Sequence, residues 1–142
     1  MKTPSGSPII QVATRGLVPV IQIIGLYVFF HGHYSPGGGF QGGVLLAASI
    51  LLARLSLGTE VSQLLFPARK TIIFSALGAL IFAGTGLAAL LAGGHFLNYE
   101  FLPLPGLEPA ELRNWGILII ESGVTITVMT SLIAIYDEII GC

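Results

Sequence analysis

GHYSPGGGFQGG, residues 32–43, separates two long apolar segments of the chain. The stretch holds six glycines and one proline, whereas the segments on either side consist almost entirely of aliphatic, aromatic and small residues. Ser35 followed by Pro36 is typical of a helix start, because a serine hydroxyl caps the first turn and proline fits the first helical position. The stretch therefore predicts a turn that ends one apolar helix and begins the next.

The composition is that of an integral membrane protein. Of the 142 residues, 54% are hydrophobic and 9% are charged, and the mean hydropathy is +0.88. Soluble domains carry about 25% charged residues, so this chain cannot cover a water-facing surface. A net charge of −1 and the lack of a basic tract argue against a nucleic-acid partner. The fold class that we predict is all-α integral membrane.

Four apolar runs are each long enough for the roughly 20 residues that a helix needs to cross a bilayer. We expect a single four-helix transmembrane domain over residues 1–142, with helices at about 14–33, 40–57, 71–92 and 115–136. Residues 1–13 are expected to form a short arm, and residues 93–114 the longest loop. Within that loop, Glu108-Pro109-Ala110-Glu111 can open one short helical turn.

The positive charges predict the side of the membrane that each connection faces. With the N-terminus inside, the inner side holds five cationic residues and the outer side one: Lys2, Arg15, Arg54, Arg69 and Lys70 against Arg113. Lysine and arginine favour the cytoplasmic side. We therefore expect both termini in the cytoplasm and the turn at 32–43 on the outer side.

The glycines of the turn allow several interpretations. Gly37-x-Gly39-x-x-Gly42 matches a dinucleotide fingerprint, but that motif needs a preceding strand, and no Walker lysine follows, so both nucleotide interpretations are rejected. The four-residue spacing of Gly38/Gly42 and Gly39/Gly43 indicates close packing between helices. A glycine-rich helix start can also expose backbone N–H groups, or break a helix beside a polar pathway. The last two interpretations are compatible.

Two histidines lie at the end of the first predicted span. His31 and His33 are two positions apart, so on a helix they point about 200° apart and cannot share one metal ion. His95 and Cys142 are distant in sequence, and no metal site is predicted. We expect at least one histidine at the membrane interface, while the other can carry protons because imidazole titrates near physiological pH.

Glu121 is the most informative charge in the sequence. It lies six or seven residues into the fourth predicted span, where a carboxylate costs several kcal/mol unless it is neutral, paired or hydrated. It either reaches interfacial water, or faces a partner subunit or an ion path. A strip of small and hydroxyl-bearing residues follows on the same helix, and we expect it to pack rather than conduct: Gly123, Thr127, Thr130, Ser131 and Ala134.

In the inferred topology, His31, His33, Gln41 and Glu121 all fall in the outer half of the membrane. If the helices bundle as neighbours, these side chains can form one polar cluster, which Gln22 can extend inward. No nucleophile–base–orienter set and no cofactor ligand pattern is present, so we expect neither enzymatic activity nor a cofactor.

The glycine-rich stretch also carries a family resemblance. Gly32-His33-x-x-Pro36-Gly37-Gly38-Gly39-Phe40-x-Gly42-Gly43 resembles the signature of the B-subunit family of Mrp-type multisubunit Na⁺/H⁺ antiporters (MrpB/MnhB). Glu121-x-Gly123-Val124 is similar to a second pattern of that family. Four spans and the chain length also match, so the resemblance covers nearly the whole chain.

The resemblance implies an integral subunit that helps to exchange Na⁺ for H⁺ across a prokaryotic cell membrane, together with other membrane subunits. Glu121 would then bind a cation or exchange protons, with His33 as an auxiliary titrating group. Similar subunits occur in membrane-bound hydrogenases and sulfur-reducing complexes, so that setting is the first alternative. A scaffold subunit without ion contact is the second.

Overall fold

The computed structural model describes residues 7–32, 38–58, 60, 63 and 66–140. These residues form four long α-helices and one short 3₁₀ turn, and they contain no β-strand. The long helices are α1 (Pro8–His31), α2 (Gly39–Leu57), α4 (Ala68–Leu91) and α5 (Pro109–Ile140), with η1 (Tyr99–Phe101) between the last two. All four are long and apolar enough to cross a membrane, so the predicted fold class is confirmed.

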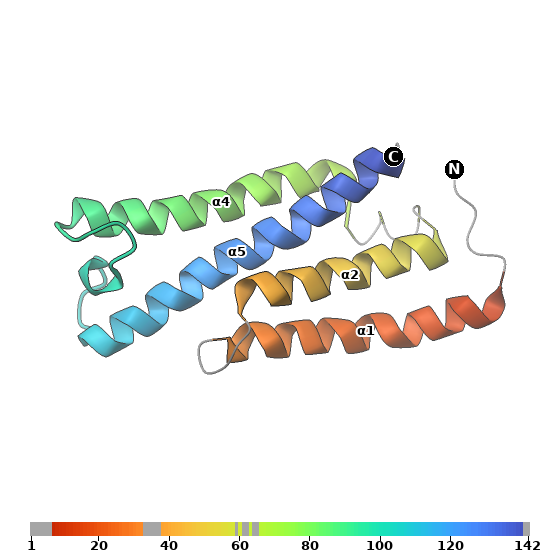
Figure 1. Ribbon diagram of the computed structural model, residues 1–142, viewed down its shortest axis with the longest axis horizontal. Coiled ribbons are helices and arrows are strands. Elements are labelled where there is room, and N and C mark those ends of the chain that lie inside the picture. The colour runs from red at the N-terminus through yellow and green to blue at the C-terminus, as the bar shows by residue number, and fades with distance from the viewer. Residues whose placement is uncertain (1–6, 33–37, 59, 61–62, 64–65, 141–142) are drawn as a thin grey trace.

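The four helices lie side by side in one layer, in the spatial order α1, α2, α5, α4 (Figure 1). The main contacts join α1 to α2, α2 to α5 and α5 to α4, so α2 and α5 are central and α1 and α4 form the edges. Figure 1 also shows that α4 and α5 continue well past the end of the α1–α2 hairpin. Gly32 and Gly38, which flank the connection between α1 and α2, therefore lie beside Glu121 within α5 and not at the tip of that helix.

Two helices begin earlier than the hydropathy pattern predicts. Helix α1 starts at Pro8, six residues before position 14, with Ser7 as an extended N-cap, because proline at the first position suits a helix start. Residues 8–13 are thus helix and not arm. Helix α5 starts at Pro109, where the Glu111 carboxylate accepts a hydrogen bond from the Glu108 backbone N–H (3.3 Å). The expected short turn at Glu108–Glu111 continues without a break into the fourth span.

Helices α4 and α5 approach closely because glycines and hydroxyls replace large side chains at their contact. A Cβ on Gly78 would lie 2.6 Å from the carbonyl oxygen of Gly123, and a Cβ on Gly123 would lie 2.8 Å from that of Gly78. The Ser75 and Ser131 hydroxyls are 2.9 Å apart, and Thr127 donates to its own helix at Gly123 O (2.9 Å). The hydroxyl-bearing strip of α5 thus packs on α4.

The loop between α4 and α5 docks on the outer ends of these two helices through aromatic rings. The Phe96 ring occupies the space that a side chain on Gly86 of α4 would need, and Tyr99 does the same at Gly116 of α5. An exposed ion pair between Arg113 and Glu100 joins the start of α5 to η1.

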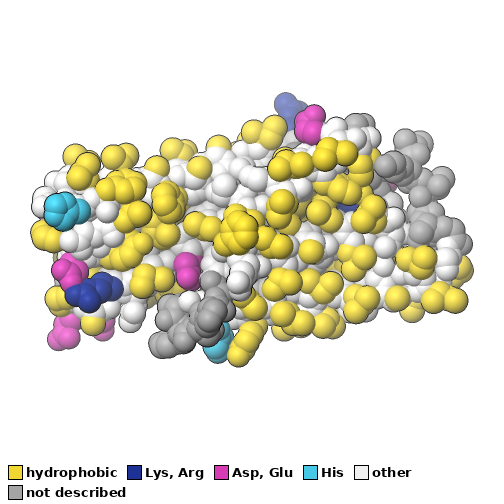
Figure 2. All heavy atoms as spheres, viewed as in Figure 1, with side chains coloured by type: hydrophobic (Ala, Val, Ile, Leu, Met, Phe, Trp, Pro, Cys, Tyr) yellow, Lys and Arg dark blue, Asp and Glu magenta, His cyan; other side chains and the backbone are white. Residues whose placement is uncertain are grey.

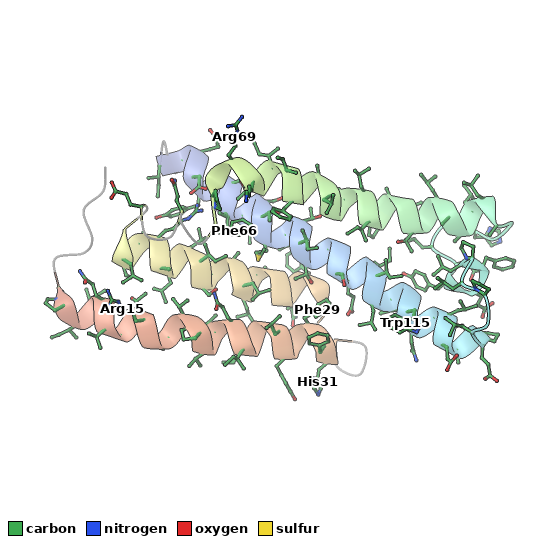
Figure 3. The ribbon with its side chains drawn as sticks, turned by 180° about the vertical axis from the view of Figure 1, so that it is seen from behind. Arg15, Phe29, His31, Phe66, Arg69 and Trp115 are labelled. Atoms are coloured by element: carbon green, nitrogen blue, oxygen red, sulfur yellow. The ribbon has the colours of Figure 1, made fainter. Side chains whose placement is uncertain are left out.

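The surface of the layer is mostly apolar (Figure 2). Large hydrophobic side chains are exposed on every helix, for example Val12 (71%), Leu55 (62%), Ile72 (67%) and Ile139 (79%). Arg15 and Arg69 lie toward one end of the layer and Trp115 toward the other (Figure 3). Such a surface suits lipid chains and the helices of other subunits.

Candidate functional site

The glycines at the start of α2 face both neighbouring helices. A Cβ on Gly39 would collide with the Glu121 carbonyl of α5, and one on Gly43 would lie 2.9 Å from the Thr125 carbonyl. Gly42 faces the other way, where a Cβ would lie 3.1 Å from the Gly25 carbonyl of α1. Because Gly39, Gly42 and Gly43 have no side chains, the backbone of α2 lies directly against α1 and α5 at these positions.

The Glu121 carboxylate lies beside Gly32 and Gly38, the two ends of the α1–α2 connection, which are themselves in close contact. A Cβ added to Gly38 would come within 2.6 Å of Glu121 Oε1, and one added to Gly32 within 3.1 Å. Gly38 has φ 106°, a conformation that glycine adopts without strain. The side chain of Glu121 is half-buried, and its Oε2 atom is buried. Glycines on both sides of the connection thus make room for this carboxylate.

The first turn of α2 gives this carboxylate a favourable electrostatic environment. The N-terminal end of a helix carries a partial positive charge from N–H groups that lack an intrahelical acceptor. Gly38, the N-cap of α2, lies beside the Glu121 carboxylate, while Gly39 packs against the Glu121 backbone. The Thr125 hydroxyl, one turn further along α5, lies 2.9 Å from Gly39 O and 2.8 Å from Glu121 O, so it can donate to either helix.

The other predicted site residues that the structure describes, Gln41, His31 and Gln22, have different environments. Gln41 is exposed. His31 is also exposed; its ring stacks on Tyr27 (centroids 4.0 Å apart) and points away from α2, whereas Phe29 points toward it (Figure 3). Gln22 is half-buried in α1 and lines a cavity of about 410 Å³ between α1, α2 and α5.

Three members of the glycine-rich signature, His33, Pro36 and Gly37, lie outside the described residues. The remaining members are Gly32, Gly38, Gly39, Phe40, Gly42 and Gly43, and Phe40 exposes 63% of its surface. The structure therefore brings Glu121 together with the backbone of Gly32, Gly38 and Gly39.

A buried ion pair between Arg54 and Asp137 was not predicted from the sequence. Arg54 of α2 is 2% exposed and Asp137 of α5 is 3% exposed, and the two side chains are in direct contact. In the sequence, Arg54 counted only as an inner-side charge, and the fourth span was expected to end before Asp137. The sequence feature that could have predicted this ion pair is the presence of opposite charges at the inner ends of two predicted spans.

The described groups next to the Glu121 carboxylate are the backbone atoms of Gly32 and Gly38, and a carboxylic acid in this setting can carry a proton. Among the residues that the structure describes, no three His, Cys, Asp or Glu side chains come together as a metal-binding group.

A family model for a domain related to the MnhB subunit of Na⁺/H⁺ antiporter matches residues 9–134. The chain belongs to this family. The MnhB match runs from the first turn of α1 almost to the end of α5, and it includes both the glycine-rich stretch and Glu121.

Curated relatives of the MnhB family match over similar lengths. The B subunit of the Na⁺/H⁺ antiporter of Bacillus subtilis is 30% identical over 131 residues, which cover 87% of this chain and 91% of the relative. The protein of the same name from Alkalihalophilus pseudofirmus is 30% identical over 135 residues, covering 90% and 93%. A putative antiporter subunit, mnhB2, of Staphylococcus aureus is 34% identical over 131 residues, covering 87% and 92%. The likeness thus extends over all four helices.

Proposed function

We propose that this chain is an integral subunit of a multisubunit Na⁺/H⁺ antiporter in a prokaryotic cell membrane, and that Glu121 takes part in its ion-translocating module. Membership of the MnhB family and the names of the curated relatives support the antiporter assignment. Four helices able to cross a bilayer support a multi-pass location. The partners are the other membrane subunits of the complex, the transported ions are Na⁺ and H⁺, and the chain has no activity alone.

The observation that carries the role of Glu121 is the glycine-lined space around its carboxylate. A carboxylate at membrane depth is costly, so such residues are rare and mark ion or proton pathways by default. Gly32 and Gly38 leave room next to Oε1, while the N-terminal end of α2 favours a negative charge. A carboxylate that only reached toward water would need no such accommodation.

The remaining polar residues have auxiliary roles in this proposal. His33, which lies outside the described residues, is an auxiliary proton-exchanging group, and His31 and Gln41 lie at the outer end of the path. Gln22 extends the path inward along α1. Both termini face the cytoplasm, which puts the α1–α2 connection on the outer side, in agreement with the positions of Arg15 and Arg69 at the opposite end of the layer.

Glu121→Gln tests the proposal in the assembled complex. The amide keeps the size of the side chain but cannot carry a negative charge or release a proton. We expect Na⁺/H⁺ exchange in membrane vesicles to fall by roughly a hundredfold, the lower range for loss of a proton-transfer group. Glu108→Gln, at an exposed carboxylate before α5, is the matched control and should exchange ions at the wild-type rate. Normal exchange by an intact Glu121→Gln complex would leave Glu121 a structural carboxylate.

Two alternatives make different predictions. As the ion-module subunit of a hydrogenase-like or sulfur-reducing complex, the protein would copurify with iron–sulfur subunits, and their genes would adjoin its own. As a pure scaffold, it would lose assembly on Gly39→Leu or Gly43→Leu but would tolerate changes at His33 and Glu121. The names of the curated relatives favour the antiporter over both.

A further inference from the structure

The inner end of the layer contains a charged group that the proposed function does not use. Arg54 Nη1 donates to Asp137 Oδ1, and Arg54 Nη2 donates to the carbonyl oxygen of Phe66 (2.8 Å). One guanidinium therefore joins α2, α5 and the residue two positions before α4. Figure 3 shows Phe66 at the end of the layer where α4 begins.

Stability alone does not account for this ion pair. Removing two charges from water costs several kcal/mol per ion, and well-packed apolar residues of similar volume are often as stabilising. The side chains of Arg54 and Asp137 are 0% and 5% exposed, so both charges have lost nearly all contact with water and bear almost the full desolvation cost. In addition, Asp137 Oδ2 is buried and accepts no hydrogen bond from the described residues. Within the described part of the chain, this anionic oxygen is thus buried without a hydrogen-bond donor.

The atoms around the guanidinium have the chemistry of a cation site. Asp137 Oδ1 and Phe66 O both contact the same positive group, and Oδ2 belongs to the same carboxylate. Carboxylate and backbone carbonyl oxygens are the usual protein ligands of hard cations and of the coupling ions of transporters. Phe66, whose carbonyl accepts from Arg54, also lines the cavity of about 410 Å³ between α1, α2 and α5.

We propose that Asp137 is a second exchange site, for a proton or Na⁺, at the cytoplasmic end of the protein. Arg54 fills this site as a tethered cation while the site is empty. Loading places H⁺ or Na⁺ on the carboxylate and releases Arg54 from Oδ1, while its bond to Phe66 O holds the guanidinium in place. Unloading restores the ion pair. The guanidinium stays charged throughout, so loading adds one positive charge to the group and unloading removes it.

This inference rests on the proposed function, because the exchange site would serve the same transport. Asp137 follows Glu121 by 16 residues on α5, which is about 24 Å along a helix axis. The two carboxylates thus serve opposite sides of the membrane. Asp137 lies beyond residues 9–134, the part of the chain that matches the family model.

Neutral variants of the pair separate an exchange site from a structural link. Asp137→Asn alone leaves a buried guanidinium without its counter-ion and can disturb folding, so the double variant Arg54→Gln/Asp137→Asn is made beside it. We expect both, when assembled, to lower Na⁺/H⁺ exchange by roughly a hundredfold. Glu138→Gln, at the exposed neighbour, should keep the wild-type rate. Wild-type exchange by the assembled double variant would overturn the proposal.

Chemical labelling tests the site in the unaltered complex and does not depend on transport. A hydrophobic carbodiimide modifies protonated carboxyl groups at membrane depth, and mass spectrometry locates the product. We expect Asp137 to be labelled, and NaCl to suppress the labelling severalfold relative to choline chloride. No labelling at Asp137, or labelling that sodium does not change, would contradict the proposal. Absence of exchange in the wild-type complex would refute the proposed function instead, while the labelling result would still report on Asp137.

Discussion

At the scale of single residues, the close contacts of the structure depend on glycines, which have no side chain. Gly32 and Gly38 give space to the Glu121 carboxylate, and Gly39 lets the backbone of α2 touch that of α5. Position 38 favours glycine for a second reason, because the φ of 106° there is strained for a residue with a side chain. By contrast, a Cβ on Gly84 of α4 would meet no atom within 4 Å. The same residue type is therefore essential at one position and replaceable at another.

Gly39→Ala and Gly84→Ala form a matched pair of substitutions in two spans. Gly39→Ala places a methyl group against the Glu121 carbonyl and must push α2 away from α5. We expect the free energy of unfolding to fall by about 1–3 kcal/mol, typical of overpacking. The second meets open space, and because alanine is the better helix former it should leave stability unchanged or raise it by up to about 1 kcal/mol. Thermal unfolding of the two variants in detergent measures the difference. Equal melting temperatures would show that α2 and α5 do not touch at Gly39.

At the scale of elements, α2 and α5 form the centre of the protein. Helix α2 uses Gly42 toward α1, and Gly39 and Gly43 toward α5, so one short stretch makes two close interfaces. Helix α5 has 32 residues and is therefore about 48 Å long, longer than the roughly 30 Å hydrocarbon core. Its extra length carries the docked loop near its N-terminal end and places Asp137 beside Arg54 near its C-terminal end.

Thr125→Val tests the link between these two central helices. Valine keeps the shape of the side chain but removes the hydroxyl that lies 2.9 Å from Gly39 O. We expect the free energy of unfolding to fall by roughly 0.6 kcal/mol, the average contribution of an interhelical hydrogen bond in membranes. Ser122→Ala is the control, because that hydroxyl donates within its own helix to Leu118 O (2.7 Å). If the control variant unfolds as early as Thr125→Val, the hydroxyl at 125 adds nothing between the helices.

At the scale of the whole molecule, the helices form an open layer and not a closed bundle. Among the described helices, each central helix has main contacts with one helix on either side (Figure 1), and the face of the layer in Figure 2 exposes many apolar side chains. The sequence suggested a polar cluster that includes Glu121 and His33. In the layer, Glu121 lies beside the backbone of Gly32 and Gly38, and His33 lies outside the described residues. An open layer suits a protein that other membrane helices cover.

The isolated chain should accordingly have no transport activity. We expect the protein expressed alone and reconstituted in vesicles to show no Na⁺/H⁺ exchange, because its described helices form an open layer in which α1 and α4 are edges. Coexpression with the other subunits of its complex should restore exchange, and the chain should copurify with them. Full exchange by a monomer running alone in detergent would refute its role as part of a larger complex.

The sequence was sufficient for features that depend on composition and local spacing. Low charge and four apolar runs required helices in a membrane, because only helices satisfy every backbone group there at this length. Gly39 and Gly43 indicated a close helix contact, and Glu121 stood out because charge is costly at membrane depth. The starts at Pro8 and Pro109 were missed because hydropathy marks the lipid-crossing part of a helix, whereas capping decides where the helix begins.

Tertiary structure alone decided which surfaces meet. Sequence gives the depth of a residue along a helix but not the direction it faces, so it could not tell that Glu121 lies against Gly38 or that Arg54 reaches Asp137. These contacts depend on the lateral order of the helices and on their relative shift along the membrane normal. Both are set by long-range packing between segments such as residues 39–57 and 109–140, which no local pattern records.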